Sequence, residues 1–270
     1  MRKNKRVGSL LATLLDDPHK IYPSKYFCEK FDVAKSSLSE DITTANEILR
    51  EDGYGFIETI SGVGGGIKFI PGISDEERIT VQDYLCKRLS APSRILGGGF
   101  LYTSDLMFDS RLVRNMSRIF AREFMSLHAD YITTVETKGI PLASAVAFMM
   151  DIPLVVIRRE AKYSEGSTVS INYFSGSYDR IQKMSIAKRA VQPDTSAIII
   201  DDFMRGGGSL KGVTEILSEF NISVAATGVA IATREPEHKK IDSYLPIIYL
   251  DDIDEERKSI TASRNLFPSV

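Results

Sequence analysis

The chain has 270 residues, 43% of them hydrophobic, and a formal charge of -2 at neutral pH. This length suggests one or two domains with real hydrophobic cores, and the charge balance argues against a generic polyanion-binding protein. Cys28 and Cys86 form no motif, and the three scattered histidines suggest neither a zinc site nor a histidine-based catalytic site. We expect a cytoplasmic protein without a signal peptide or membrane span, because the longest apolar run, residues 140–157, contains two prolines and an aspartate.

The first seventy residues carry the spacing of three helices. Apolar residues recur at helical spacing from Val7 to Leu15, and residues 16–18 are expected to end that helix. Ser24 is expected to cap a second, short helix that turns Phe27 and Phe31 inward. A third helix follows a short turn, with an apolar face made of Leu38, Ile42, Ala45 and Leu49. Two helices joined in this way indicate a helix-turn-helix.

The start of the third helix is a candidate DNA-reading surface. Its exposed positions carry polar groups that can reach phosphates and base edges, namely Lys35, Ser36, Ser37, Ser39 and Glu40. The alternative is an ordinary solvated helix face. Two predicted strands, 56–61 and 67–70, flank a glycine-rich turn that looks like the wing of a winged helix, which favours the DNA-binding interpretation. We expect Gly64, Gly65 and Lys68 to lie along the DNA backbone.

Basic residues open the chain. Residues 1–70 contain ten basic and ten acidic side chains, so the asymmetry lies in the first six positions, with Arg2, Lys3, Lys5 and Arg6. We expect an arm that contacts the DNA backbone, and a disordered terminus is the alternative.

A domain boundary is predicted near residue 73, because Pro71 and Gly72 interrupt the second wing strand. The expected domains are therefore 1–73 and 74–270. Ser74 opens a capping box for a helix that carries Ile79, Tyr84, Leu85 and Leu89. A loop over 92–99 and an amphipathic helix over 110–127 should follow.

The rest of the chain alternates between strands and helices. Strands are predicted at 131–135, 153–157, 168–174, 197–200, 224–232 and 247–250, with helices between several of them. This alternation implies an α/β domain with a mostly parallel sheet.

The segment from residue 196 to 210 organises this second domain. A short buried strand ends at Asp201 and Asp202, and a loop with three glycines leads into a helix that begins near Ser209. Glycine amides and a helix N-terminus suit a phosphate, while two adjacent carboxylates can each accept a hydrogen bond from a vicinal hydroxyl. The pattern therefore predicts a site for ribose 5-phosphate, and a chance glycine-rich turn is the alternative. It matches neither a P-loop nor a dinucleotide-binding fingerprint.

Residues 198–209 resemble the phosphoribosyl-pyrophosphate motif of type I phosphoribosyltransferases, with Arg205-Gly206 and Ser209 where other residues are commoner. The resemblance implies that Lys138 and its neighbours in the loop 136–141 meet a pyrophosphate, and that residues 158–184 form a flap. Arg158, Arg159 and Lys162 could then face phosphates, although an exposed basic hairpin is an equal alternative. The resulting effector-binding set is Tyr102, Thr137, Lys138, Gly139, Asp201, Asp202, Phe203, Met204, Arg205, Gly206, Gly207, Gly208 and Ser209, in which Phe203 or Tyr102 would stack on a base.

A winged helix followed by such a domain resembles the purine operon repressors of Gram-positive bacteria over nearly the whole chain. The resemblance implies a homodimer that binds control regions of purine genes, and a second domain that senses phosphoribosyl pyrophosphate, with or without Mg²⁺, and is not an enzyme. Guanosine tetraphosphate is a competing ligand in some relatives, and one branch activates transcription. No catalytic residue and no metal ligand are therefore expected. The alternatives are an active purine phosphoribosyltransferase with an accessory N-terminal domain, and an adaptor whose winged helix binds protein.

Overall fold

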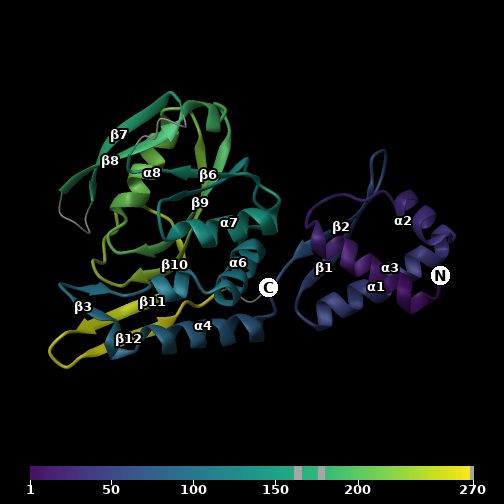
Figure 1. The fold of residues 1–270 in the computed structure, drawn as a ribbon, viewed down its shortest axis with the longest axis horizontal. Coiled ribbons are helices and arrows are strands. Elements are labelled where there is room, and N and C mark those ends of the chain that lie inside the picture. Colours follow the sequence, from purple (N-terminus) through teal and green to yellow (C-terminus); the bar gives the residue numbers. More distant parts are fainter. Residues whose placement is uncertain (161–165, 176–179, 268–270) are drawn as a thin grey trace.

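The computed structural model describes residues 1–160, 166–175 and 180–267, and Lys162 lies outside these ranges. A small N-terminal domain is joined to a larger α/β domain (Figure 1), and residues 72–74 connect the last strand of the first to the first helix of the second. The small domain contains α1 (Lys3–Asp16), α2 (Ser24–Phe31), α3 (Lys35–Glu51), β1 (Gly55–Ile60) and β2 (Gly66–Pro71).

The small domain is a winged helix, as predicted. The apolar spacing of the three helices produces a common core, whose fully or almost fully buried members include Leu10, Leu14, Phe27, Leu38 and Leu49. Strands β1 and β2 pair antiparallel, from Gly55 opposite Pro71 to Ile60 opposite Gly66, and their connection forms the wing.

Two local predictions in this domain are wrong. Ser24 is the first residue of α2 and does not cap it, because Pro23 occupies the N-cap position and no side chain caps the helix. The basic residues at the start do not form a free arm, since α1 already begins at Lys3. The continuous apolar spacing that starts at Val7 evidently supports another helical turn before it.

The larger domain contains the following helices and strands: α4 (Asp75–Leu89), β3 (Ile95–Gly97), β4 (Phe100–Leu101), α5 (Ser104–Met107), α6 (Ser110–Phe124), β5 (Tyr131–Val135), α7 (Gly139–Met150), β6 (Leu154–Ile157), β7 (Thr168–Ser175), β8 (Arg180–Ala187), β9 (Ser196–Met204), α8 (Gly208–Ser218), β10 (Ser223–Thr233), β11 (Leu245–Asp254) and β12 (Ser259–Arg264). Short 3-10 turns cover Pro92–Arg94 and Lys188–Ala190.

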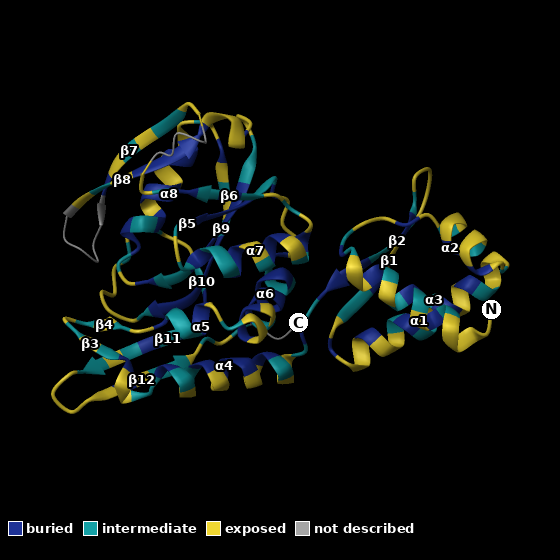
Figure 2. Ribbon diagram, viewed as in Figure 1, coloured by how far each residue is buried: buried dark blue, intermediate teal, exposed yellow. Residues whose placement is uncertain are grey.

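Six strands form the central sheet in the order β12-β11-β10-β9-β5-β6, and all neighbours are parallel except β11 and β12. The prediction of a mostly parallel sheet is therefore confirmed. Figure 2 shows the buried strands between helical layers. Along β9, Ile198 and Ile200 join the core beneath α4, α6 and α7, whereas Ala197 and Ile199 join the core beneath α8. Strands β7 and β8 form the separate antiparallel flap hairpin that was expected.

Some boundaries differ from the prediction. Residues 92–99 are not a simple loop, because they contain a 3-10 turn and β3, which pairs with β4. Strand β9 continues through both aspartates to Met204, and β12 was not foreseen because it is a polar edge strand. On α4, Ile79 and Tyr84 are exposed, while Gln82 is buried and donates to the carbonyls of Ile247 and Asn265.

Candidate ligand cavity and DNA-binding surface

The two aspartates lie in the middle of the sheet, near the carboxyl end of β9. Asp201 is buried and Asp202 is half-buried, and the backbone amide of Asp202 donates to Oδ1 of Asp201 over 3.0 Å. Ligands of open α/β sheets bind beyond the strand ends. The position of the pair therefore matches a ligand site at this edge.

The two carboxyl groups are held in an environment that disfavours their charge. Burial raises the pKa of Asp201 well above its ordinary value, and the neighbouring Asp202 raises it further. Burial also raises the pKa of Asp202, whereas the positive charge of Lys138 acts in the opposite direction. Hydroxyl donors from a ligand would stabilise the charged form of both groups.

These pKa shifts predict how Asp201→Asn changes stability. A carboxyl with a raised folded-state pKa stabilises the fold only at low pH, and this contribution is lost as pH rises from its unfolded pKa of about 4 through the folded value. The melting temperature of the ligand-free variant should therefore exceed that of the wild type at pH 7.5, and the difference should shrink at pH 4.5. Calorimetry at both pH values measures this.

Asp130 provides the opposite control. Hydrogen bonds from the backbone and hydroxyl of Ser196 lower the pKa of Asp130, so Asp130→Asn should lose stability at pH 7.5. Equal melting temperatures of Asp201→Asn and the wild type at pH 7.5 would show that the buried charge of Asp201 does not lower the stability of the folded protein.

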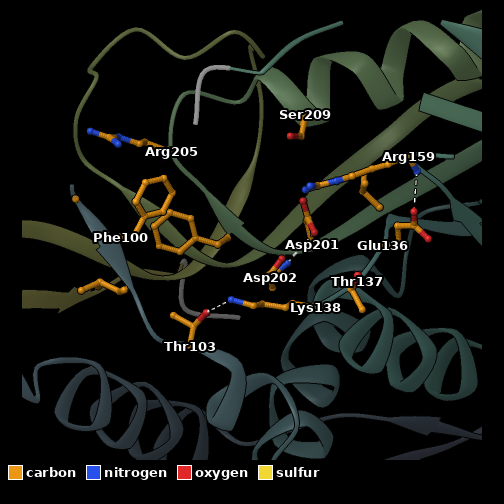
Figure 3. A pocket seen from close by; sticks show the side chains of 14 residues that line it. Phe100, Thr103, Glu136, Thr137, Lys138, Arg159, Asp201, Asp202, Arg205 and Ser209 are labelled. Atoms are coloured by element: carbon orange, nitrogen blue, oxygen red, sulfur yellow. Dashed lines mark hydrogen bonds between the residues drawn. The ribbon is translucent and has the colours of Figure 1, made fainter. Parts of the chain in front are cut away.

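A cavity of about 380 Å³ opens beside the acid pair (Figure 3). It combines residues from the β3–β4 hairpin and Thr103 after it, which we call the hood, from the end of β5 and the loop that follows, from the segment after β6, and from the end of β9 and the loop that follows. The lining residues are Gly99, Phe100, Leu101, Thr103, Val135, Glu136, Thr137, Lys138, Arg159, Asp201, Asp202, Phe203, Arg205 and Ser209. Four segments that are distant in sequence thus meet at one site.

The loop after β9 forms a turn around the N-terminus of α8. Gly207 has a φ of +77°, which favours glycine, and the carbonyl of Gly206 accepts from the amide of Lys240 over 2.9 Å. A second, small hollow adjoins the cavity here and is lined by residues 203–210 together with Asp201. Met204, Gly206, Gly207 and Gly208 line this hollow, whereas Asp201, Phe203, Arg205 and Ser209 line both spaces. The arrangement has the features of a phosphate site at a helix N-terminus.

Two basic side chains, Lys138 after β5 and Arg159 after β6, also line the cavity. Nζ of Lys138 lies 3.4 Å from Oγ1 of Thr103, and the side chain of Arg159 extends toward Asp201 (Figure 3). Glu136 accepts from the backbone amide of Arg159 over 2.8 Å and from Arg158 over 3.2 Å. The cavity thus contains both carboxylates for hydroxyls and cations for phosphates.

Gly139 is packed directly against the acid pair. A Cβ atom at this position would lie 2.7 Å from Oδ1 of Asp201 and 2.3 Å from Oγ1 of Thr134. The first residue of α7 must therefore lack a side chain for Asp201 to keep its place.

One aromatic residue was assigned wrongly. Tyr102 is not among the residues that line the cavity, and its side chain is exposed. Its backbone is paired with Arg94, which accepts from the Tyr102 amide and donates to its carbonyl. Phe100, the first residue of β4, lines the cavity together with Phe203. Sequence reasoning also missed Thr103, whose position depends on the β3–β4 hairpin.

The start of α3 presents the side chains expected of a DNA-reading helix. Lys35, Ser36 and Ser39 are exposed and Ser37 is half-buried. In the wing, Gly64 is exposed with a φ of +80°, and Gly65 approaches the carbonyl of Ile60 so closely that a Cβ would lie 2.3 Å from it. Lys68 is half-buried on β2 and forms an ion pair with Glu58 at 3.1 Å.

Arg6, one of the basic residues expected to contact DNA, is paired within the small domain. Its guanidinium donates to both carboxylate oxygens of Asp41 on α3, over 2.6 and 3.0 Å, and the Asp41 side chain is completely buried. Arg2, Lys3 and Lys5 remain exposed. The spacing of α1 places Arg6 on the side that faces α3, so it holds the two helices together.

Among the described residues, no helix is both long and apolar enough to cross a membrane. No group of three or more metal-ligating side chains occurs in those residues either.

Comparisons with known proteins match both domains. Residues 2–71 match the model described as bacterial purine repressor, N-terminal, and residues 108–258 match the phosphoribosyl transferase domain. The purine biosynthesis transcriptional repressor PurR of Bacillus subtilis is 38% identical over 98% of this chain and 93% of its own length. The purine biosynthesis transcriptional activator PurR of Lactococcus lactis is 34% identical over 96% of both chains.

More distant matches cover the larger domain. A xanthine phosphoribosyltransferase of Oenococcus oeni is 24% identical over 66% of this chain and 89% of its own. The crystal structure of an adenine phosphoribosyltransferase from Thermoanaerobacter pseudethanolicus has a TM-score of 0.53 and 17% identity, over 62% of this chain and 98% of that one. At this identity the structural match shows a shared fold.

Proposed function

The chain belongs to the family of bacterial purine biosynthesis transcription regulators, and we propose that its larger domain senses phosphoribosyl pyrophosphate and thereby controls DNA binding by the winged helix. One observation carries this proposal: the cavity that holds the acid pair and Lys138 adjoins a small hollow formed by the glycine loop at the N-terminus of α8. These three parts fit, in that order, a ribose diol, a pyrophosphate and a 5-phosphate.

Each part of the ligand has a counterpart in the site. Asp201 and Asp202 would accept from the two ribose hydroxyls, and amides of residues 204–209 would donate to the 5-phosphate. Lys138 and Arg159 would face the pyrophosphate. Phe100 and Phe203 could hold a base if a nucleotide such as guanosine tetraphosphate occupied the same cavity.

Mg²⁺ would enter with the ligand. A pyrophosphate supplies most of the oxygen ligands that this ion prefers, and the acid pair could add carboxylate oxygens. We expect phosphoribosyl pyrophosphate to bind more weakly when EDTA removes the ion. A homodimer, as in the family resemblance, completes the proposed working unit on operator DNA.

Calorimetric titration tests the proposed ligand. Phosphoribosyl pyrophosphate should bind more tightly than ribose 5-phosphate or pyrophosphate alone, because only the complete ligand occupies both phosphate sites and the acid pair. If pyrophosphate alone binds with equal affinity, the cavity is a general anion site that does not recognise the ribose 5-phosphate part.

We expect no transfer of ribose phosphate to a purine base. The prediction rests on the family and on the DNA-binding domain that precedes the cavity. Xanthine, adenine, guanine and hypoxanthine should each be incubated with phosphoribosyl pyrophosphate while pyrophosphate release is followed, with an active xanthine phosphoribosyltransferase as the positive control. Steady turnover with any base would make the protein an enzyme with an accessory domain.

Lys35 should contribute to DNA binding through a phosphate contact. It is exposed at the first position of α3. Lys35→Ala should weaken operator binding for all sequences and reduce the slope of log affinity against log salt concentration by about one. Lys25→Ala on α2, also exposed, provides a charge-matched comparison. An unchanged salt slope in Lys35→Ala would remove this residue from the interface.

A further inference from the structure

Arg118 on α6 lies where the two domains meet. Its side chain is only 6% exposed, although it carries a charge and belongs to a helix of the larger domain. Figure 1 shows α6 at the side of the larger domain that faces the small domain, beside α4 and α7. A buried arginine in this position requires partners for all of its donors.

Those partners come from both domains. Nε donates to the carbonyl of Gly72 over 2.8 Å, and one terminal nitrogen donates to the carbonyl of Gly53 over 2.6 Å. The two terminal nitrogens also form a paired contact with the carboxylate of Glu77, at 2.9 Å each. The guanidinium carbon of Arg118 also lies over the ring of Tyr54, 5.0 Å from the ring centroid. One side chain thus connects the α3–β1 turn, the interdomain segment and α4.

The backbone around Arg118 is closely packed on both sides of the interdomain segment. A Cβ on Gly55 would lie 2.1 Å from the carbonyl of Ile70, and one on Gly53 would lie 3.1 Å from the side chain of Ser74. The carbonyl of Ile73 accepts from Arg122, one helical turn after Arg118, over 2.7 Å. We call residues 53–55 and 72–77 the joint.

Helix α6 also packs on β10, the strand next to the one that carries the acid pair. Phe120, two residues after Arg118, is completely buried. A Cβ on Gly228 would lie 2.6 Å from the Phe120 ring and 3.0 Å from Ile200, the residue that precedes Asp201. A continuous set of packed groups therefore leads from the acid pair to the joint through α6. Packed interiors of this kind transmit small displacements.

We propose that Arg118 is the positioning residue that transmits occupancy of the cavity to the DNA-binding domain, a role that rests on the proposed function. A ligand that draws Asp201 and β9 toward it moves the sheet beneath Phe120, and α6 carries Arg118 with it. The guanidinium passes this displacement to Gly53 and Gly72 at the same time. The planar guanidinium can donate to Gly53, Gly72 and Glu77 at the same time. Neither a lysine nor an apolar side chain can make this full set of hydrogen bonds.

The first experiment measures coupling. Operator DNA is titrated with and without saturating phosphoribosyl pyrophosphate, using wild type, Arg118→Met, Arg118→Lys and, as the control, Arg78→Met. Arg78 is equally buried on α4 and pairs with Asp75 at the edge of the joint, but Asp75, Glu123 and Phe267, which it contacts, all lie in the larger domain. In Arg118→Met the ratio of the two affinities should fall close to 1, while the operator affinity measured without phosphoribosyl pyrophosphate changes by less than about threefold. Arg118→Lys should show an intermediate ratio, and Arg78→Met the ratio of the wild type.

The second experiment measures the joint without any ligand. Hydrogen exchange of the Tyr54 and Gly72 amides, which donate to Leu49 and Tyr54 respectively, should become faster in Arg118→Met and stay unchanged in Arg78→Met. This readout does not depend on phosphoribosyl pyrophosphate.

The outcomes separate the two proposals. If the operator affinity of the wild-type protein is the same with and without phosphoribosyl pyrophosphate, the proposed function is refuted. A wild-type response that persists in full in folded Arg118→Met, or in Arg118→Lys where the former does not fold, would overturn the role of Arg118 alone. Loss of coupling in Arg78→Met to the same extent would also overturn it, because any buried arginine would then have the same effect.

Discussion

Replacing both aspartates, Asp201→Ala with Asp202→Ala, should abolish binding of phosphoribosyl pyrophosphate and with it the response of DNA binding. A hydrogen bond to a charged group contributes about 1.5–3 kcal/mol, so loss of two such bonds should weaken binding by roughly 10² to 10⁴-fold. Calorimetry measures this loss directly.

DNA binding by the same variant should survive, because the acid pair and the winged helix share no residues. Operator affinity without effector is the internal control and should change by less than about threefold. Asp242→Ala with Asp252→Ala, at exposed positions outside the cavity lining, is a charge-matched comparison. A double variant that still responds fully would locate the effector elsewhere, and one that folds without binding DNA would show that the domains are not separable.

Arg6→Ala should unfold or nearly unfold the small domain. The substitution leaves the completely buried Asp41 carboxylate without its partner, and breaking a buried ion pair in this way is strongly destabilising. We expect its melting temperature to fall by about 10–20 °C, because a domain of this size has little stability to lose. Hydrogen exchange across residues 1–71 measures the effect separately from the larger domain.

Two further variants give this prediction its controls. Arg6→Met with Asp41→Leu removes both charges and should recover most of the lost stability, since apolar residues of similar volume can replace a buried pair. Lys5→Ala removes an exposed neighbour and should leave stability almost unchanged. If Arg6→Ala is as stable as Lys5→Ala but binds DNA more weakly, Arg6 belongs to the DNA interface after all.

The predictable parts of this fold are those that local pattern determines. The three helices of the small domain follow from apolar spacing, and the buried strand with its two aspartates is recognisable because a glycine loop and a helix come directly after it. The acid pair, the loop of residues 204–209 and the segment 136–141 could be singled out because each is continuous in sequence.

The parts that were missed depend on contacts between distant segments. Arg6 looked like one more basic residue, and only the packing of α1 on α3 shows that it pairs with Asp41, 35 positions away. Tyr102 and Phe100 are two residues apart, and only the folded structure shows that Phe100, which pairs with Gly97 in the short β3–β4 hairpin, is the one that lines the cavity. Strand β12 has a polar sequence, so its pairing with β11 is visible only once the sheet is assembled.

The most direct test of the central claim is a reciprocal titration on the wild-type protein. Operator affinity is measured at increasing concentrations of phosphoribosyl pyrophosphate, and the affinity for phosphoribosyl pyrophosphate is measured with and without saturating operator DNA. Because coupling between two sites is reciprocal, both affinities should change by the same factor, about 5- to 150-fold. An operator affinity that stays constant up to saturation of the cavity would contradict the account.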